Sequence, residues 1–138
     1  MNDLWIWGVR AAGAFHFVTL ISALATPIPP DWDENLARLP ETHRRFSIAQ
    51  NYSIGAVMVF CGAVSLLFAP TLVSGSVAAR IVCAGIALWW GGRAVVLPWL
   101  RIWPQLKSRA WRAGFVLLVL ECVIYALAYG WLAARPIG

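Results

Sequence analysis

Four polar side chains, one from each of four apolar stretches of this 138-residue sequence, fall in the half of the expected bundle nearest to most of the basic residues. They are an imidazole, a side-chain amide, a guanidinium and a carboxylate, contributed by His16, Asn51, Arg93 and Glu121. Ionisable groups at membrane depth are costly, so they normally pair with one another or face protein or water. Two adjacent indoles, Trp89 and Trp90, precede the arginine. Together these side chains are the candidate residues for ligand binding.

The depths of Arg93 and Glu121 predict an ion pair between them. Counted from the helix ends nearest to most of the basic residues, Arg93 lies about five residues in and Glu121 about eight, a difference of ~4.5 Å that an arginine side chain can span. Two interpretations are open. The pair is a structural clamp, or it is the polar floor of a cytoplasm-facing cavity, with His16 and Asn51 as further hydrogen-bonding groups and an indole as a wall.

No recognisable catalytic arrangement accompanies these residues. The sequence has no glycine-rich phosphate loop, no GxSxG or HExxH motif, and no Ser/His/Asp set at one depth. Cys61, Cys83 and Cys122 form no CxxC pair, so we interpret them as small buried apolar residues. His16 fits a hydrogen-bonded interior histidine better than a metal or haem ligand. The sequence therefore predicts no catalytic or metal-binding residue and identifies no cofactor.

The helices that must hold these side chains are four apolar stretches, at residues 4–26, 47–69, 77–98 and 113–133. Each is close to the ~20 residues that cross a hydrocarbon core as a helix. No alternation of apolar and polar residues supports strands. Short connections between the stretches favour an up-down bundle. The predicted fold is an all-α integral membrane protein, a four-transmembrane-helix up-down bundle in a single domain of residues 1–138.

Composition supports a membrane protein and argues against a nucleic-acid partner. Hydrophobic residues make up 61% of the sequence and charged residues only 12%, against about 25% charged residues in soluble domains. The net charge of +5 lies mostly beside the apolar stretches and forms no long basic stripe. The expected partners are membrane lipids, together with other membrane subunits or further copies of the chain in an oligomer.

The basic residues also predict an orientation. Seven of the eleven Lys and Arg residues fall in the first and third connections. The positive-inside rule then places those connections in the cytoplasm and both termini outside, in a bacterial-type inner membrane. Tryptophans at both ends of the stretches, such as Trp5 and Trp131 at one end and Trp103 and Trp111 at the other, fit two interfacial belts.

The first connection, between the first two apolar stretches, contains a pattern for a short helix lying in the cytoplasmic interface. Asp31 is a potential N-cap, and the helix must end before Pro40. Trp32, Leu36 and Leu39 recur at helical spacing and share one face. The pattern fits either an amphipathic helix on the membrane surface or a lid packed on the end of the bundle.

Four arginines are candidates for binding lipid headgroups or another anion: Arg44, Arg45, Arg109 and Arg112. Arg44 and Arg45 stand just before the expected second long helix, at the positive end of its dipole, where cations are disfavoured. An anionic group is therefore expected to compensate for them, either a lipid phosphate or a bound substrate.

A further pattern extends from residue 44 to about residue 112. A basic start to the second helix leads to Ala49-Gln50-Asn51, and Gly92-Arg93 late in the third helix is followed by a basic connection. In these features the chain resembles the membrane-associated eicosanoid and glutathione metabolism family. Its members are four-helix proteins that form trimers and use glutathione to conjugate or isomerise lipophilic substrates. The resemblance implies that Asn51 and Arg93 are polar contacts to a ligand.

Three functions are compatible with these observations. Because well-anchored helices occur without a recognisable catalytic set, the first is an accessory or assembly subunit of a membrane complex, or a lipid-binding bundle. The second is a glutathione-transferase-like membrane enzyme that acts on lipophilic substrates. The third is a small-solute transporter that uses Glu121 as a proton-coupled site.

Overall fold

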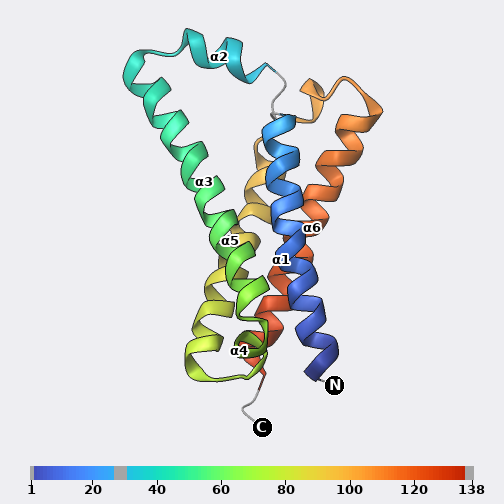
Figure 1. Cartoon of the computed structure of the whole chain (residues 1–138). Coiled ribbons are helices and arrows are strands. Elements are labelled where there is room, and N and C mark those ends of the chain that lie inside the picture. The colour runs from blue at the N-terminus through green and yellow to red at the C-terminus, as the bar shows by residue number, and fades with distance from the viewer. Residues whose placement is uncertain (1, 27–30, 136–138) are drawn as a thin grey trace.

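Helices make up nearly all of the described chain. The computed structural model describes residues 2–26 and 31–135, and these ranges contain no strand. Figure 1 shows four long helices: α1 (Asn2–Ala25), α3 (Glu41–Leu67), α5 (Val77–Trp99) and α6 (Arg109–Ala134). Between them lie two short helices and a 3-10 turn: α2 (Trp32–Arg38), α4 (Ala69–Val73) and η1 (Trp103–Gln105).

The four long helices confirm the predicted number and approximate positions of the apolar helices. All four are long and apolar enough to cross a membrane. Consecutive long helices run in opposite directions, so α1 begins and α6 ends at the same end of the bundle (Figure 1). The all-helical, up-down arrangement expected from the sequence is therefore present.

The start of α3 corrects the sequence-based boundary. The helix begins at Glu41 rather than at residue 47, with Pro40 at its N-cap. A negative charge is favourable in a first turn, and the Glu41 carboxylate pairs with Arg45 at 2.5 Å. Arg44 and Arg45 therefore lie inside the helix, not just before it, and an acid of the chain itself compensates for Arg45.

The short helix expected in the first connection is present as α2. Its half-buried side chains are Trp32 and Leu36, which share a face as predicted, whereas Leu39 is 40% exposed. Asp31 is the N-cap residue, as predicted, but its side chain makes no capping hydrogen bond. The proline run before α2, at residues 27–30, lies outside the described residues.

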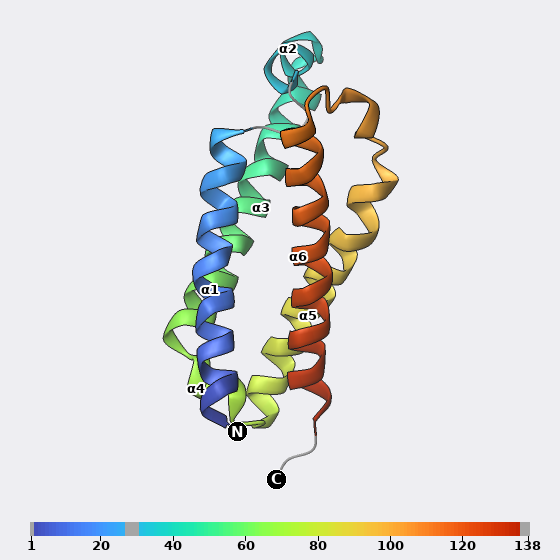
Figure 2. The ribbon, with the colours of Figure 1, turned by 90° about the vertical axis from the view of Figure 1, so that its right-hand side faces the viewer.

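The long helices associate as two pairs. The most extensive contacts join α1 to α3 and α5 to α6, and α4 touches α1, α3 and α5 at one end of the bundle. Figure 2 shows the same division from the side, with α1 in front of α3 and α6 in front of α5. Contacts between the backbones of the two pairs are sparse, so side chains must bridge from one pair to the other.

Two glycines allow α1 and α3 to cross at close range. A Cβ atom on Gly13 would lie 2.9 Å from the backbone nitrogen of Leu66 and 3.0 Å from the carbonyl oxygen of Gly62. A Cβ atom on Gly62 would lie 2.7 Å from a ring carbon of Phe17. Small residues at such crossings let membrane helices gain packing energy from close approach. The crossing thus fixes α1 against the second half of α3.

The two halves of α3 differ in how they pack. The buried residues of this helix all lie in its second half: Met58, Cys61, Gly62 and Ser65. The first half, residues 41–57, contributes no buried residue, and Figure 1 shows it diverging from the other long helices toward α2. In α3, the fully buried part of the core therefore begins at Met58, with Ile54 and Val57 half-buried against it.

Adding one methyl group tests the crossing of α1 and α3. Gly13→Ala should destabilise the detergent-solubilised protein by about 1–3 kcal/mol, because the new Cβ forces α1 away from the α3 backbone. Gly85→Ala is the matched control, since nothing lies within 4 Å of a Cβ at that position. The measurement is the melting temperature of each variant. Equal melting temperatures for the two variants would contradict the close crossing.

Candidate functional site

A buried polar cluster joins α1 to the α5–α6 pair. Five side chains form this polar cluster: His16 and Thr19 of α1, Trp90 of α5, and Glu121 and Tyr125 of α6. His16 and Trp90 are fully buried and Tyr125 nearly so, whereas Thr19 and Glu121 are half-buried. Spacings of three residues in α1 and four in α6 place each pair of side chains on one face of its helix.

His16 has a defined hydrogen-bonding state. The indole Nε1–H of Trp90 donates to His16 Nε2 at 3.0 Å, and an indole nitrogen can only donate. His16 Nδ1 therefore carries the ring hydrogen and donates it to the carbonyl oxygen of Ala12 at 2.6 Å. Each ring nitrogen thus has a hydrogen-bond partner, as expected for a hydrogen-bonded interior histidine. Neither nitrogen is free to bind a metal or to accept a proton from a substrate.

The rings of the polar cluster also pack against one another. The His16 and Tyr125 rings are stacked, with centroids 4.3 Å apart and planes inclined by 11°. The Trp90 ring meets both edge-on, at centroid distances of 5.1 Å from His16 and 5.0 Å from Tyr125. Aromatic pairs contribute about 0.5–1.5 kcal/mol each beyond their burial. Ring packing therefore adds to the hydrogen bonds that hold α1, α5 and α6 together.

Glu121 accepts hydrogen bonds from two hydroxyl groups. The Thr19 hydroxyl lies 2.8 Å from Oε1 and 2.7 Å from Oε2 of the carboxyl group. The Tyr125 hydroxyl lies 2.7 Å from Oε1, and its alternative acceptor, the Ala12 carbonyl oxygen, is 3.2 Å away. The Thr19 contact crosses from α1 to α6, so the carboxyl group links the two helix pairs.

The predicted ion pair between Arg93 and Glu121 is not formed. No ion pair involving either residue occurs in the described part of the chain. The Arg93 guanidinium lies instead beside Trp89, with Cζ 6.0 Å from the ring centroid. The prediction compared depths along α5 and α6 only. It could not include Thr19, whose hydroxyl reaches the carboxyl group from α1.

Of the two adjacent indoles, only Trp90 belongs to the polar cluster. Trp89 is not part of it, and the Nε1 of Trp89 is buried without a hydrogen-bond partner among the described residues. The same holds for Nε of Arg93, one turn further along the helix. Trp89 and Arg93 lie on the predicted helix, but neither side chain belongs to the polar cluster that contains His16.

Asn51 also lies outside the polar cluster. It is exposed on the first half of α3, next to the exposed side chains of Gln50 and Tyr52. Because the buried residues of α3 all lie in its second half, Asn51 is kept away from His16 although the two were expected in the same half of the bundle. The predicted grouping of these two residues is wrong.

The four arginines predicted to bind anions have different surroundings. All four are exposed, and the structure gives no ion pair for Arg44 or Arg109 among the described residues. Arg112 donates from Nε to the Leu106 carbonyl oxygen at 3.0 Å, and its Cζ lies 5.6 Å from the Trp103 ring centroid. Arg112 therefore orders the connection between α5 and α6, and Arg45 is engaged with an acid of its own helix.

Sequence reasoning missed the hydroxyl groups of the site. Thr19 and Tyr125 belong to no motif, and their role depends on which helix faces lie together. One local signal was available, because Tyr125 follows Glu121 by four residues and can reach it on a helix. A second buried contact, between the hydroxyls of Ser65 and Tyr129 at 2.5 Å, links α3 to α6 and has no sequence signature.

The chain matches no protein-family model, no curated protein and no solved structure. The resemblance to the membrane-associated eicosanoid and glutathione metabolism family therefore stays a prediction from the sequence. Its two carried-over residues, Asn51 and Arg93, lie on α3 and α5, which do not pack along one another. Function must accordingly be argued from the geometry of the chain itself.

The hydroxyl contacts of Glu121 predict which residue pairs are energetically coupled. In a double-mutant cycle, Thr19→Val and Glu121→Leu should show a coupling of about 0.6 kcal/mol, the average for hydrogen bonds between membrane helices, and at most about 1.7 kcal/mol. Arg93→Leu and Glu121→Leu should show a smaller coupling, because these two side chains form no ion pair. The measurement is the free energy of unfolding in mixed micelles. A larger coupling for the Arg93 pair would indicate that Arg93 and Glu121 do form an ion pair and would contradict the geometry described.

Proposed function

We propose that the chain is a non-catalytic subunit of a larger membrane complex, which it joins through the first half of α3. The observation that carries this proposal is the packing of residues 41–57. None of them is buried, yet they belong to a helix long and apolar enough to cross a membrane. A membrane helix that diverges from its own bundle offers its surface to a helix of another chain.

The side chains on this half of α3 favour a protein partner over lipid. Gln50 and Asn51 expose two adjacent side-chain amides, and Tyr52 is 77% exposed. Asn51 lies about ten residues, or ~15 Å, from the start of the helix, which is hydrocarbon depth for a helix that spans the membrane. Amides at that depth lack water as a partner. Hydrogen bonds to a neighbouring helix satisfy them.

The interior of the bundle also supports a binding role. Both ring nitrogens of His16 are committed, and two hydroxyl groups hold the carboxyl group of Glu121. These contacts join helices and leave no base or nucleophile poised within the polar cluster. The glutathione-dependent enzyme needs Asn51 and Arg93 in one site, and the transporter needs Glu121 released from its hydroxyl partners. The subunit hypothesis requires neither change.

Photo-crosslinking from α3 tests the proposal. A photoreactive amino acid in place of Gln50 or Asn51 should cross-link to another protein in the native membrane, because these side chains face the proposed partner. The same amino acid in place of Leu117 or Ile124, exposed apolar residues of α6, is the matched control and should react mainly with lipid. The products are separated by electrophoresis and identified by mass spectrometry.

The three outcomes of this experiment have different meanings. A protein of different sequence cross-linked to the α3 positions supports the proposal. Products at multiples of the chain mass would replace it with self-association into an oligomer. Lipid adducts alone at both α3 positions would overturn it, because the amides would then face the bilayer without a protein partner.

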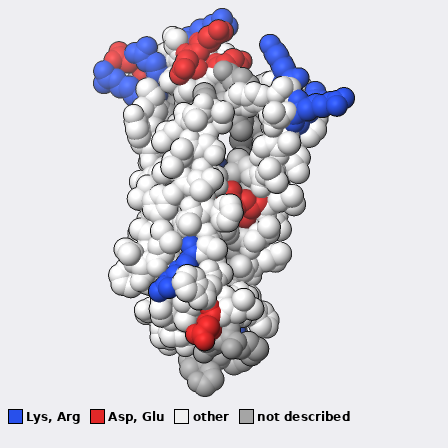
Figure 3. Space-filling model, turned by 45° about the vertical axis from the view of Figure 1, so that its right-hand side comes forward, with Lys and Arg blue, Asp and Glu red and all other residues white. Residues whose placement is uncertain are grey.

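We further propose that the end of the bundle with α2 and the α5–α6 connection faces the cytoplasm of a bacterial-type inner membrane. Figure 3 shows charged side chains of both signs gathered at this end. Seven of the eleven Lys and Arg residues lie at this end, in the two connections or in the first residues of α3 and α6, and the positive-inside rule assigns an end so enriched to the cytoplasm. Both termini are then outside.

Cysteine labelling tests this orientation. Ser74→Cys, between α4 and α5, should react with a membrane-impermeant maleimide added to spheroplasts, whereas Gln105→Cys should react only after lysis. Both positions are exposed. The three native cysteines are buried and free, so they contribute little background. Labelling of Gln105→Cys but not Ser74→Cys in intact spheroplasts would invert the proposed orientation.

A further inference from the structure

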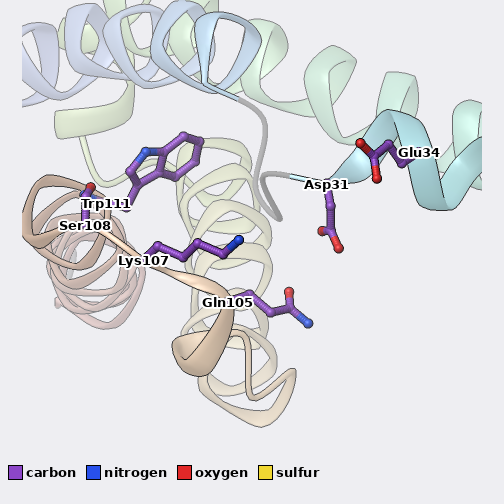
Figure 4. Close-up of a pocket in the computed structure, with 6 residues that line it drawn as sticks. All are labelled: Asp31, Glu34, Gln105, Lys107, Ser108 and Trp111. Atoms are coloured by element: carbon purple, nitrogen blue, oxygen red, sulfur yellow. The ribbon is translucent and has the colours of Figure 1, made fainter.

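A cleft lies at the α2 end of the bundle, between α2 and the connection from α5 to α6. Its volume is about 440 Å³, within the range of cavities that hold small-molecule ligands. Figure 4 shows the lining residues: Asp31, Glu34, Gln105, Lys107, Ser108 and Trp111. The lining combines charges of both signs with an amide, a hydroxyl and an indole.

Opposite charges come from opposite walls of this cleft. Asp31 and Glu34 belong to the α2 side, and Lys107 extends from the α5–α6 connection into the cleft (Figure 4). Within the described part of the chain, Lys107 forms no ion pair with either acid. One ammonium and two carboxylates therefore remain available to a ligand that carries both a negative and a positive group.

We propose that the cleft binds the phosphoethanolamine headgroup of a membrane lipid. The Lys107 ammonium binds the phosphate, and the carboxylates of Asp31 and Glu34 bind the primary ammonium of ethanolamine, as charge-assisted hydrogen bonds. The Ser108 oxygen accepts the backbone N–H of Trp111 at 3.2 Å, so its hydroxyl hydrogen is left to donate to the phosphate.

The lining discriminates against other common headgroups. Two carboxylates and one ammonium leave a net negative charge, which disfavours a purely anionic headgroup such as phosphoglycerol. A choline headgroup has no N–H donor for the carboxylates, and quaternary ammonium groups are bound by aromatic cages. Among the described residues that line the cleft, Trp111 is the one aromatic side chain. Ethanolamine, with three N–H donors, matches the lining best.

The position of the cleft agrees with the headgroup level of a bilayer. The connection that forms one wall follows the end of α5 and precedes the start of α6, two helices long and apolar enough to span hydrocarbon. Trp103 and Trp111 lie there, and tryptophans concentrate at this level. Below it, Val116, Leu117 and Leu120 expose apolar surface for acyl chains. The inference needs only a membrane-embedded chain and does not depend on a partner at α3.

Native mass spectrometry of the delipidated protein tests the assignment. Dioleoyl phosphatidylethanolamine should bind at least roughly fivefold more tightly than the phosphatidylcholine and phosphatidylglycerol with the same chains. Lys107→Gln, and the double variant Asp31→Asn with Glu34→Gln, should each weaken its binding roughly fivefold, as expected for an exposed charge pair. Equal binding of the three lipids, or unchanged binding in both variants, would overturn the proposal.

Matched variants and a soluble ligand make the test specific. Arg38→Gln and Asp33→Asn remove exposed charges of α2 that do not line the cleft, so they should leave binding unchanged. The double acid variant keeps Lys107 alone and should now prefer phosphatidylglycerol, a switch that general destabilisation cannot produce. If soluble phosphoethanolamine displaces the lipid at equal concentration, the site recognises a free metabolite and the lipid assignment fails.

Discussion

The hydrogen bond between Trp90 and His16 is the contact on which the arrangement of this bundle depends. It joins two helix pairs whose backbones make few direct contacts, and it sets the hydrogen position on the imidazole. Tyr125 stacks on the same imidazole and reaches Glu121, which Thr19 holds from α1. In hydrocarbon these groups cannot exchange their partners for water, so the network must be satisfied within the protein.

The two ends of the bundle meet different demands. In the second half of α3, the glycine crossing with the middle of α1 and the Ser65–Tyr129 contact hold this helix against its neighbours. Toward α2 the same helix diverges and exposes the amides of Gln50 and Asn51. Lipid is as apolar as a leucine side chain, so exposed apolar residues alone do not indicate a partner in a membrane. The proposed partner instead satisfies the exposed amides at hydrocarbon depth, because lipid chains offer them no hydrogen bond.

The charged groups inside the bundle and those at its α2 end have different surroundings. Glu121 is held by neutral hydroxyl groups from two helices, an arrangement suited to a fixed position at low dielectric. At the α2 end, Lys107 and the two acids opposite it make no ion pair with one another in the described part of the chain. Water at the headgroup level solvates such charges, so they can exchange it for a ligand at small cost. The same residue types therefore serve to hold helices in one place and to bind a ligand in the other.

The sequence by itself determined the class of the protein and the approximate extent of its four long helices. A helix that crosses hydrocarbon needs about 20 apolar residues and satisfies its own backbone, and both requirements are local. Only the tertiary structure decided which polar side chains meet. Depth along a helix is one coordinate, whereas the rotation of each helix and the divergence of α3 depend on packing between distant segments. Hence Thr19 holds Glu121, while Arg93 and Asn51, although similar in depth, do not join the polar cluster.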